Sequence, residues 1–73
     1  MRLEQILGSN IRRIREARGL TQEALAAEAG IDMRYLGGIE RGQENPSISV
    51  VANIAKALEV HPNTLLLESP AKS

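Results

Sequence analysis

Residues 22–41 read QEALAAEAGIDMRYLGGIER, and this stretch decides the fold. Gly30 separates two short segments in which apolar residues recur at helical spacing, and a glycine there provides the left-handed backbone of a tight turn. Ala26 is small where two helices joined by such a turn approach each other. The residues expected to face inward are Leu25, Ala29, Ile31, Leu36 and Ile39. The pattern predicts a helix-turn-helix, whose second helix typically lies in the major groove of DNA.

The flanking sequence also reads as helices, and no alternating apolar pattern supports a strand. We expect five helices, over residues 3–18, 22–29, 33–41, 48–58 and 62–67. The signals at their ends are the caps Thr21, Asp32, Ser47 and His61, the first-turn Pro62, and the glycines 19, 30 and 42. The core faces of the first and fourth helices are expected to carry Ile6, Leu7, Ile11 and Ile14, and Ile48, Val51, Ala55 and Leu58. The fold class is therefore all-α.

Length and composition exclude several classes of protein. The chain has 73 residues, which allows one small domain, expected over 1–67 with a short tail at 68–73. It has no Cys and one His, so we expect no disulfide, no metal site, no cofactor and no catalytic set, and hence no enzyme. No apolar run approaches the length of a membrane span, and no signal peptide or small-molecule site is evident, so a cytoplasmic location is expected.

Charge is balanced overall but unevenly distributed. Residues 1–21 carry five Arg and two Glu, a net of +3, whereas residues 22–40 carry a net of −3. This asymmetry predicts a basic edge and internal ion pairs. Arg12, Arg13 and Arg18 fit a solvated helix face and a phosphate-binding patch equally well.

The sequence resembles the phage-repressor and Cro-like helix-turn-helix regulators over residues 6–67. The segments that carry the resemblance are IRRIR at 11–15, GLTQE at 19–23, LA at 25–26, AG at 29–30, IERG at 39–42, NPS at 45–47 and IAKALEV at 54–60. The resemblance implies a compact lambda-repressor-like domain that binds double-stranded DNA and regulates transcription. The stretch YLGGIER at 35–41 is also similar to the controller proteins of restriction–modification systems.

The resemblance also implies roles for individual residues. Its base-contacting positions are Met33, Arg34, Gly37 and Gly38, and its backbone-contacting positions are Gln22, Tyr35, Arg41, Gln43, Asn45 and Ser47. Arg15 and Glu40 match a partly buried ion pair between the first and third helices. Met33 suits either a thymine-methyl contact or a half-buried gap. The Gly37–Gly38 pair departs from the family pattern, and it fits close packing as well as close approach to DNA.

Leu65, Leu66 and Leu67 predict a homodimer. Three successive helical residues point about 100° apart, so they cannot all face one core. At least one is expected to cover a partner copy, together with Ile54 beside the core stripe of the fourth helix. A protein-interaction module on the same fold, such as an antitoxin, is the alternative function.

Overall fold

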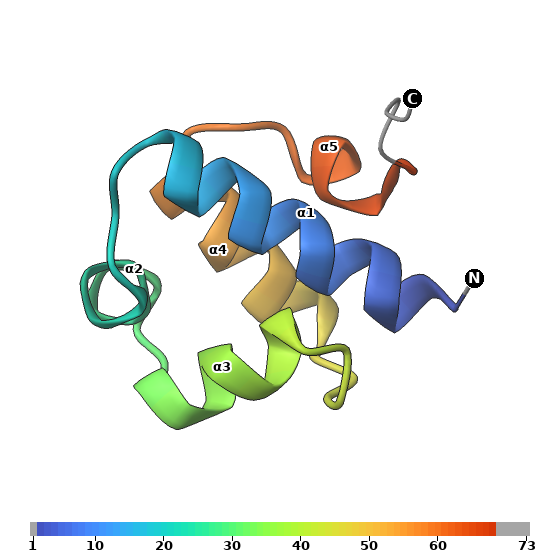
Figure 1. Ribbon diagram of the computed structural model, residues 1–73, viewed down its shortest axis with the longest axis horizontal. Helices are drawn as coiled ribbons and strands as arrows, with labels where there is room; N and C mark the ends of the chain where they lie inside the picture. The colour runs from blue at the N-terminus through green and yellow to red at the C-terminus, as the bar shows by residue number, and fades with distance from the viewer. Residues whose placement is uncertain (1, 69–73) are drawn as a thin grey trace.

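The computed structural model describes residues 2–68, and these residues form five helices and no strand (Figure 1). The helices are α1 (Leu3–Ala17), α2 (Gln22–Ala29), α3 (Met33–Glu40), α4 (Ile48–Leu58) and α5 (Pro62–Leu66). The predicted all-α fold is confirmed, and every helix end lies within a residue of its expected place. The expected tail at 68–73 lies, after Glu68, outside the described residues. Within residues 2–68, no helix is long and apolar enough to cross a membrane.

Side-chain caps begin four of the five helices, as the sequence predicts. Thr21 Oγ1 accepts a hydrogen bond from the Ala24 amide at 3.0 Å, and an Asp32 carboxylate oxygen accepts one from the Arg34 amide at 2.9 Å. Ser47 Oγ and His61 Nδ1 accept equivalent bonds at the starts of α4 and α5. Each cap satisfies an amide that the helix itself leaves without an acceptor, which fixes where the helix begins.

The core lies where α1 packs on α3 and α5, and where α4 packs on α2 and α5. Figure 1 shows α1 crossing in front of α4, with α2 and α3 on the opposite side of the domain from α5. Its fully buried aliphatic side chains are Ile11, Leu25, Leu36, Ile39, Ile54, Leu58 and Leu65. Five short helices thus share one aliphatic core that lacks Phe and Trp.

One core prediction is wrong. Ile48 was expected on the buried stripe of α4, but its side chain is 89% exposed. The buried residues of α4 are Ile54, Ala55 and Leu58, all in its second half. Ile48 is the first residue of α4, and no other helix within residues 2–68 covers its side chain. Helical periodicity shows which face a residue lies on, but it does not show where along the helix that face is covered.

Two close contacts join α1 to the rest of the domain. A Cβ atom at Gly8 would clash with the carbonyl oxygen of Ile39 and lie 2.7 Å from that of Glu40, so α1 and α3 touch backbone to backbone there. Asn10 is fully buried, and its Nδ2 donates to the Leu65 oxygen at 2.9 Å and to the Leu67 oxygen at 2.6 Å. Asn10 therefore satisfies carbonyl groups at the end of α5 and fixes that helix to α1.

Candidate nucleic-acid interface

The corner between α2 and α3 is built around Gly30. Gly30 ends α2 with φ of +73°, in the left-handed region that a glycine adopts without strain. The Ile31 amide then donates to the Ala26 carbonyl at 3.0 Å, which closes the turn. Ala26 and Ala29 are buried with Leu36 in the common core. The corner therefore fixes how α3 packs against α2.

The outward face of α3 is the candidate base-reading surface. Because Leu36 and Ile39 fill the core, residues 33, 34, 37 and 38 point away from it. Met33 and Arg34 are exposed, as expected of residues that read bases. Gly37 and Gly38 are buried, however, because side chains that follow α3 in the sequence lie over them.

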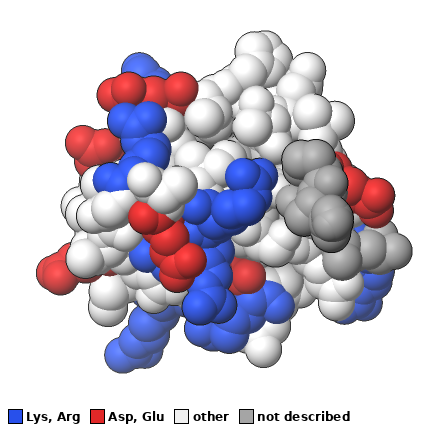
Figure 2. All heavy atoms as spheres, turned by 45° about the horizontal axis from the view of Figure 1, so that its top comes forward, with Lys and Arg blue, Asp and Glu red and all other residues white. Residues whose placement is uncertain are grey.

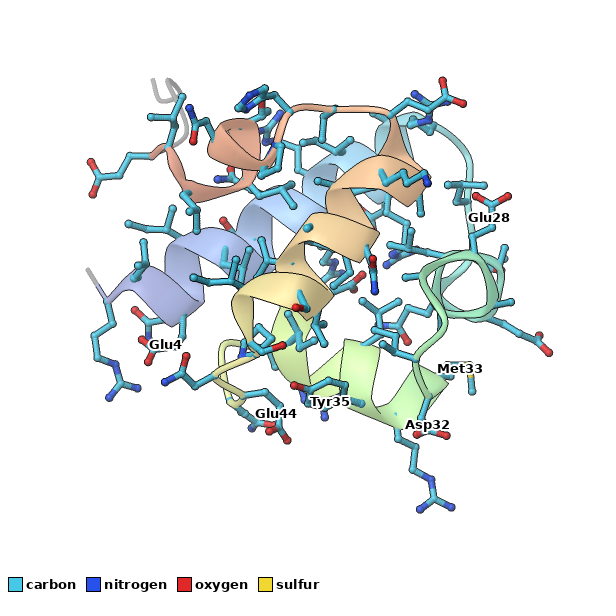
Figure 3. All side chains as sticks on the ribbon, turned by 180° about the vertical axis from the view of Figure 1, so that it is seen from behind. Glu4, Glu28, Asp32, Met33, Tyr35 and Glu44 are labelled. Atoms are coloured by element: carbon cyan, nitrogen blue, oxygen red, sulfur yellow. The ribbon has the colours of Figure 1, made fainter. Side chains whose placement is uncertain are left out.

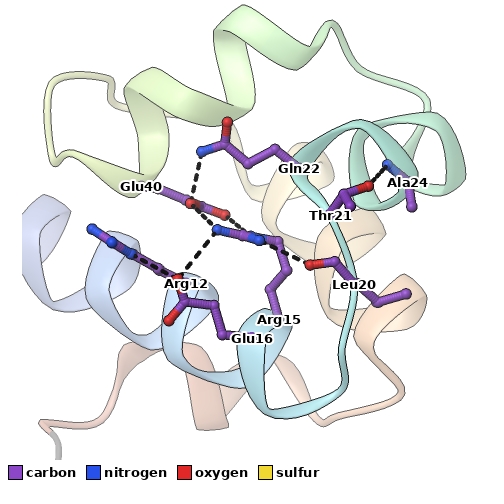
Figure 4. Close-up of polar contacts among 8 residues, drawn as sticks. All are labelled: Arg12, Arg15, Glu16, Leu20, Thr21, Gln22, Ala24 and Glu40. Carbon is purple, nitrogen blue, oxygen red and sulfur yellow. Dashed lines mark hydrogen bonds and ion pairs between the residues drawn. The ribbon is translucent and has the colours of Figure 1, made fainter.

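A buried network holds the C-terminal end of α3 (Figure 4). Arg15 Nε lies 2.7 Å from Glu40 Oε2, and Arg15 Nη2 lies 3.1 Å from Glu40 Oε1, so the pair is bidentate. Gln22 Nε2 also donates to Glu40 Oε1 at 2.9 Å, which adds α2 to the network. The predicted ion pair between α1 and α3 is confirmed.

The contacts of Arg15 favour its charged form. The hydrogen bonds with Glu40 raise the pKa of the Arg15 guanidinium above its ordinary value, although burial acts in the opposite direction. Arg15 Nη1 also donates to the Leu20 carbonyl at 2.8 Å, in the turn before α2. Arg15 therefore joins α1 both to the turn before α2 and to the end of α3.

The residues expected to contact the DNA backbone surround α3. Gln22 and Tyr35 are half-buried, whereas Arg41, Gln43, Asn45 and Ser47 are exposed. Arg41 Nε donates to Gln43 Oε1 at 3.0 Å, so these two side chains lie together after the end of α3. Ser47 caps α4 through the Val50 amide at 3.2 Å. Their contacts with DNA stay predictions.

Comparison with known proteins decides the family. The sequence profile of the helix-turn-helix family matches residues 11–65. This chain belongs to that family. It is a DNA-binding transcriptional regulator of the helix-turn-helix type, as the sequence predicts.

Several relatives of this helix-turn-helix regulator are named as control proteins. The control protein C.SmaI of Serratia marcescens is 34% identical over 73 residues, which cover 100% of this chain and 87% of that protein. The control protein C.BamHI of Bacillus amyloliquefaciens is 39% identical over 62 residues, 84% of this chain and 76% of the relative. The crystal structure of the restriction–modification controller protein C.AhdI from Aeromonas hydrophila matches with a TM-score of 0.83 and 42% identity, over 85% of this chain and 94% of that one. The predicted resemblance to controller proteins is confirmed.

The basic residues of α1 contact their own chain. Figure 2 shows blue side chains gathered over α1, interrupted by red acidic ones. Arg12 pairs with Glu16 at 3.2 Å, and Arg18 pairs with Glu59 at the same distance. For Arg12 and Arg18, these contacts favour a solvated face whose charge is locally neutralised. Arg13 Nη2 donates to the Asn10 amide oxygen at 3.1 Å, which fits both interpretations.

The dimer-interface prediction needs correction at two positions. Ile54 and Leu65 are fully buried in the regulator's own core, so neither presents a side chain to a partner. Leu66 and Leu67 remain exposed at 39% and 64%. The argument that three successive leucines cannot share one core therefore holds, with Leu65 as the one that turns inward.

A surface groove contains apolar residues that the sequence reasoning did not place there. Leu3, Val51, Leu66 and the exposed Ile48 line an open groove of about 570 Å³ between α1, α4 and α5. Exposed large aliphatic side chains brought together on one side of a small domain are typical of a protein-binding surface.

Sequence reasoning also missed Glu44. Its side chain lies over α3, with Cγ only 2.9 Å from the place of a Cβ atom on Gly38. In Figure 3, Asp32 and Met33 lie at the other end of α3 from Glu44. A loop glutamate carries no periodic signal, so only the folded structure brings it to this face.

Proposed function

We propose that this regulator binds a pseudo-palindromic DNA operator as a homodimer, with α3 of each copy in the major groove. The observation that carries this proposal is the face of α3 that bears Met33 and Arg34. Both side chains are exposed on a helix that the α2 corner and the Arg15–Glu40 pair hold rigidly. A fixed helix with a projecting guanidinium suits hydrogen bonding to guanine O6 and N7.

The groove between α1, α4 and α5 is proposed as the surface that joins the two copies. Its exposed aliphatic members, Leu3, Ile48 and Leu66, form a patch that a second copy can match across a two-fold axis. α4 begins soon after α3 ends, so a two-fold axis near Ile48 brings the two α3 helices to the same side of the dimer. Recognition helices about one DNA turn apart, roughly 34 Å, then meet successive major grooves.

The regulated genes are proposed from the relatives. C.SmaI and C.BamHI are control proteins, and C.AhdI is a restriction–modification controller protein. Similarity to C.SmaI extends over this entire chain. We therefore propose that the operator lies upstream of genes of a restriction–modification system, including the gene of the regulator itself.

Footprinting of the purified protein on the DNA upstream of its own gene tests the function. The expected result is a protected region with two related half-sites whose centres are about one helical turn apart. Arg34→Ala should remove the protection, whereas Arg12→Ala, which changes the charge equally on α1, should retain it. Absence of any protected site, or co-purification with a second small protein that blocks DNA binding, would contradict the proposal.

A further inference from the structure

The double glycine of α3 is covered by long side chains that come from outside the helix. A Cβ atom on Gly37 would lie 3.1 Å from Arg41 Nη1, and one on Gly38 would lie 2.9 Å from Glu44 Cγ and 3.2 Å from Glu44 Oε2. Both glycines belong to the outward face of α3, opposite Leu36 and Ile39. The outward surface in the middle of α3 is therefore made by Arg41 and Glu44.

The backbone fixes the loop that carries Glu44. Gly42 adopts φ of +76°, and its amide donates to the Ile39 carbonyl at 3.0 Å. The Gln43 amide donates to the Gly38 carbonyl at 2.9 Å. These two bonds turn the chain back along α3, so that Glu44 follows directly at the level of Gly38.

The Glu44 carboxylate has no partner within residues 2–68. It makes neither an ion pair nor a hydrogen bond there, while Arg41 is joined to Gln43. A carboxylate beside a DNA-facing helix is repelled by phosphates, and a hydrogen bond donated by a base offsets this repulsion. In the major groove, cytosine presents only a donor, its N4 amino group, whereas adenine places the acceptor N7 beside its N6 donor.

We propose that Glu44 is a specificity-determining residue that accepts a hydrogen bond from the N4 amino group of a cytosine in each half-site. Gly38 is the position that makes room for it, because a side chain there would occupy the place of Glu44 Cγ. This inference rests on the proposed function, since it requires α3 to lie in the major groove.

Selection from a pool of randomised duplex DNA tests the assignment. The wild-type protein should select a motif with a cytosine that is favoured about tenfold at one position of each half-site. Glu44→Gln should move the preference at that position toward adenine, because a glutamine side chain pairs with adenine N6 and N7. Glu28→Gln is the matched control: it removes the same charge from α2, away from Glu44 in Figure 3, and should select the wild-type motif.

Gly38→Ala provides a second test that leaves Glu44 in the sequence. The added methyl group must displace the flexible Glu44 side chain, so the cytosine preference should fall severalfold while circular dichroism still shows a folded helical protein. If both Glu44→Gln and Gly38→Ala select the wild-type motif, Glu44 only covers the helix and the assignment is wrong. If the wild-type protein selects no motif, the proposed function itself fails.

Discussion

Glu40 at the end of α3 is held by Arg15 of α1 through two hydrogen bonds, 2.7 and 3.1 Å long. The Glu40 side chain is 2% exposed and that of Arg15 is 11% exposed, so solvent screens the attraction between the two charges only weakly. The same pair of helices touches backbone to backbone at Gly8. The position of the recognition helix therefore depends on α1, although α1 is not part of the helix-turn-helix motif.

Arg15→Ala should lower the free energy of unfolding by about 3 kcal/mol, because it leaves the Glu40 carboxylate buried without its cation. The loss is measured by urea denaturation of the wild-type and variant proteins. Arg12→Ala is the control, since the Arg12–Glu16 pair is exposed and should contribute less than about 1 kcal/mol. Equal midpoints for the two variants would show that the buried pair does not stabilise the domain.

Gly8→Ala should destabilise the protein by about 1–3 kcal/mol through overpacking, even though alanine is the better helix former. The new methyl group meets the backbone carbonyls of Ile39 and Glu40, which cannot move without separating α1 from α3. Gly38→Ala is the matched control, because its methyl group meets only the flexible side chain of Glu44. The melting temperature of Gly38→Ala should therefore be higher than that of Gly8→Ala. The reverse order would contradict the close packing of α1 on α3.

Most of the fold could be predicted because its helix boundaries depend on hydrogen bonds between residues that are close in the sequence. Thr21, Asp32 and Ser47 cap helices through bonds to amides two or three residues away, so the sequence contains all the partners. Gly8 and Asn10 act over long separations instead. Gly8 packs against the carbonyls of Ile39 and Glu40, and Asn10 donates to carbonyls at the end of α5, so their partners are remote in the sequence and no local pattern points to them.

The candidate site was less predictable than the fold for the same reason. Met33 and Arg34 follow from helical phase, which the sequence supplies. The cover of Gly38 by Glu44 depends on how the loop after α3 turns back, and the burial of Ile54 and Leu65 depends on the packing of α4 and α5. Neither is determined by spacing along the chain.

Ile48→Asp should convert the proposed dimer into a 7.9 kDa monomer at tens of micromolar in sedimentation experiments. The side chain is 89% exposed, so its removal costs the monomer little, and an acidic residue is favourable in the first turn of α4. Ala24→Asp places the same charge in the first turn of α2 and should leave the dimer intact. A wild-type protein that sediments only as a monomer would contradict the dimer.

Operator binding should depend only modestly on salt for a DNA-binding protein. The chain has a formal net charge of zero, and Arg12 and Arg18 are paired with acidic residues of α1 and the α4–α5 turn. If a dimer neutralises about six phosphates, the slope of log K against log salt concentration should lie near −5. Titrations at several salt concentrations give this slope, and a value near −10 would show a much larger phosphate interface.

Arg34→Ala should weaken binding to the operator far more than binding to scrambled DNA. Its guanidinium is an exposed hydrogen-bond donor on the outward face of α3, and a bidentate contact with guanine is worth about 1–3 kcal/mol per half-site. Gln22→Ala should weaken both more evenly, because a phosphate contact positions the protein without reading sequence. Each variant is titrated with operator and scrambled duplexes at one fixed salt concentration.

The comparison between the two variants separates base contact from backbone contact. Gln22 Nε2 also donates to Glu40, so its removal should loosen the end of α3 and lower the affinity for every DNA sequence. Arg34 makes no side-chain hydrogen bond or ion pair within residues 2–68, so its removal should leave the fold unchanged. If Arg34→Ala lowers the affinities for operator and for scrambled DNA by the same factor, Arg34 contacts only the sugar-phosphate backbone of the DNA. Discrimination between operators must then come from the shape and deformability of the DNA.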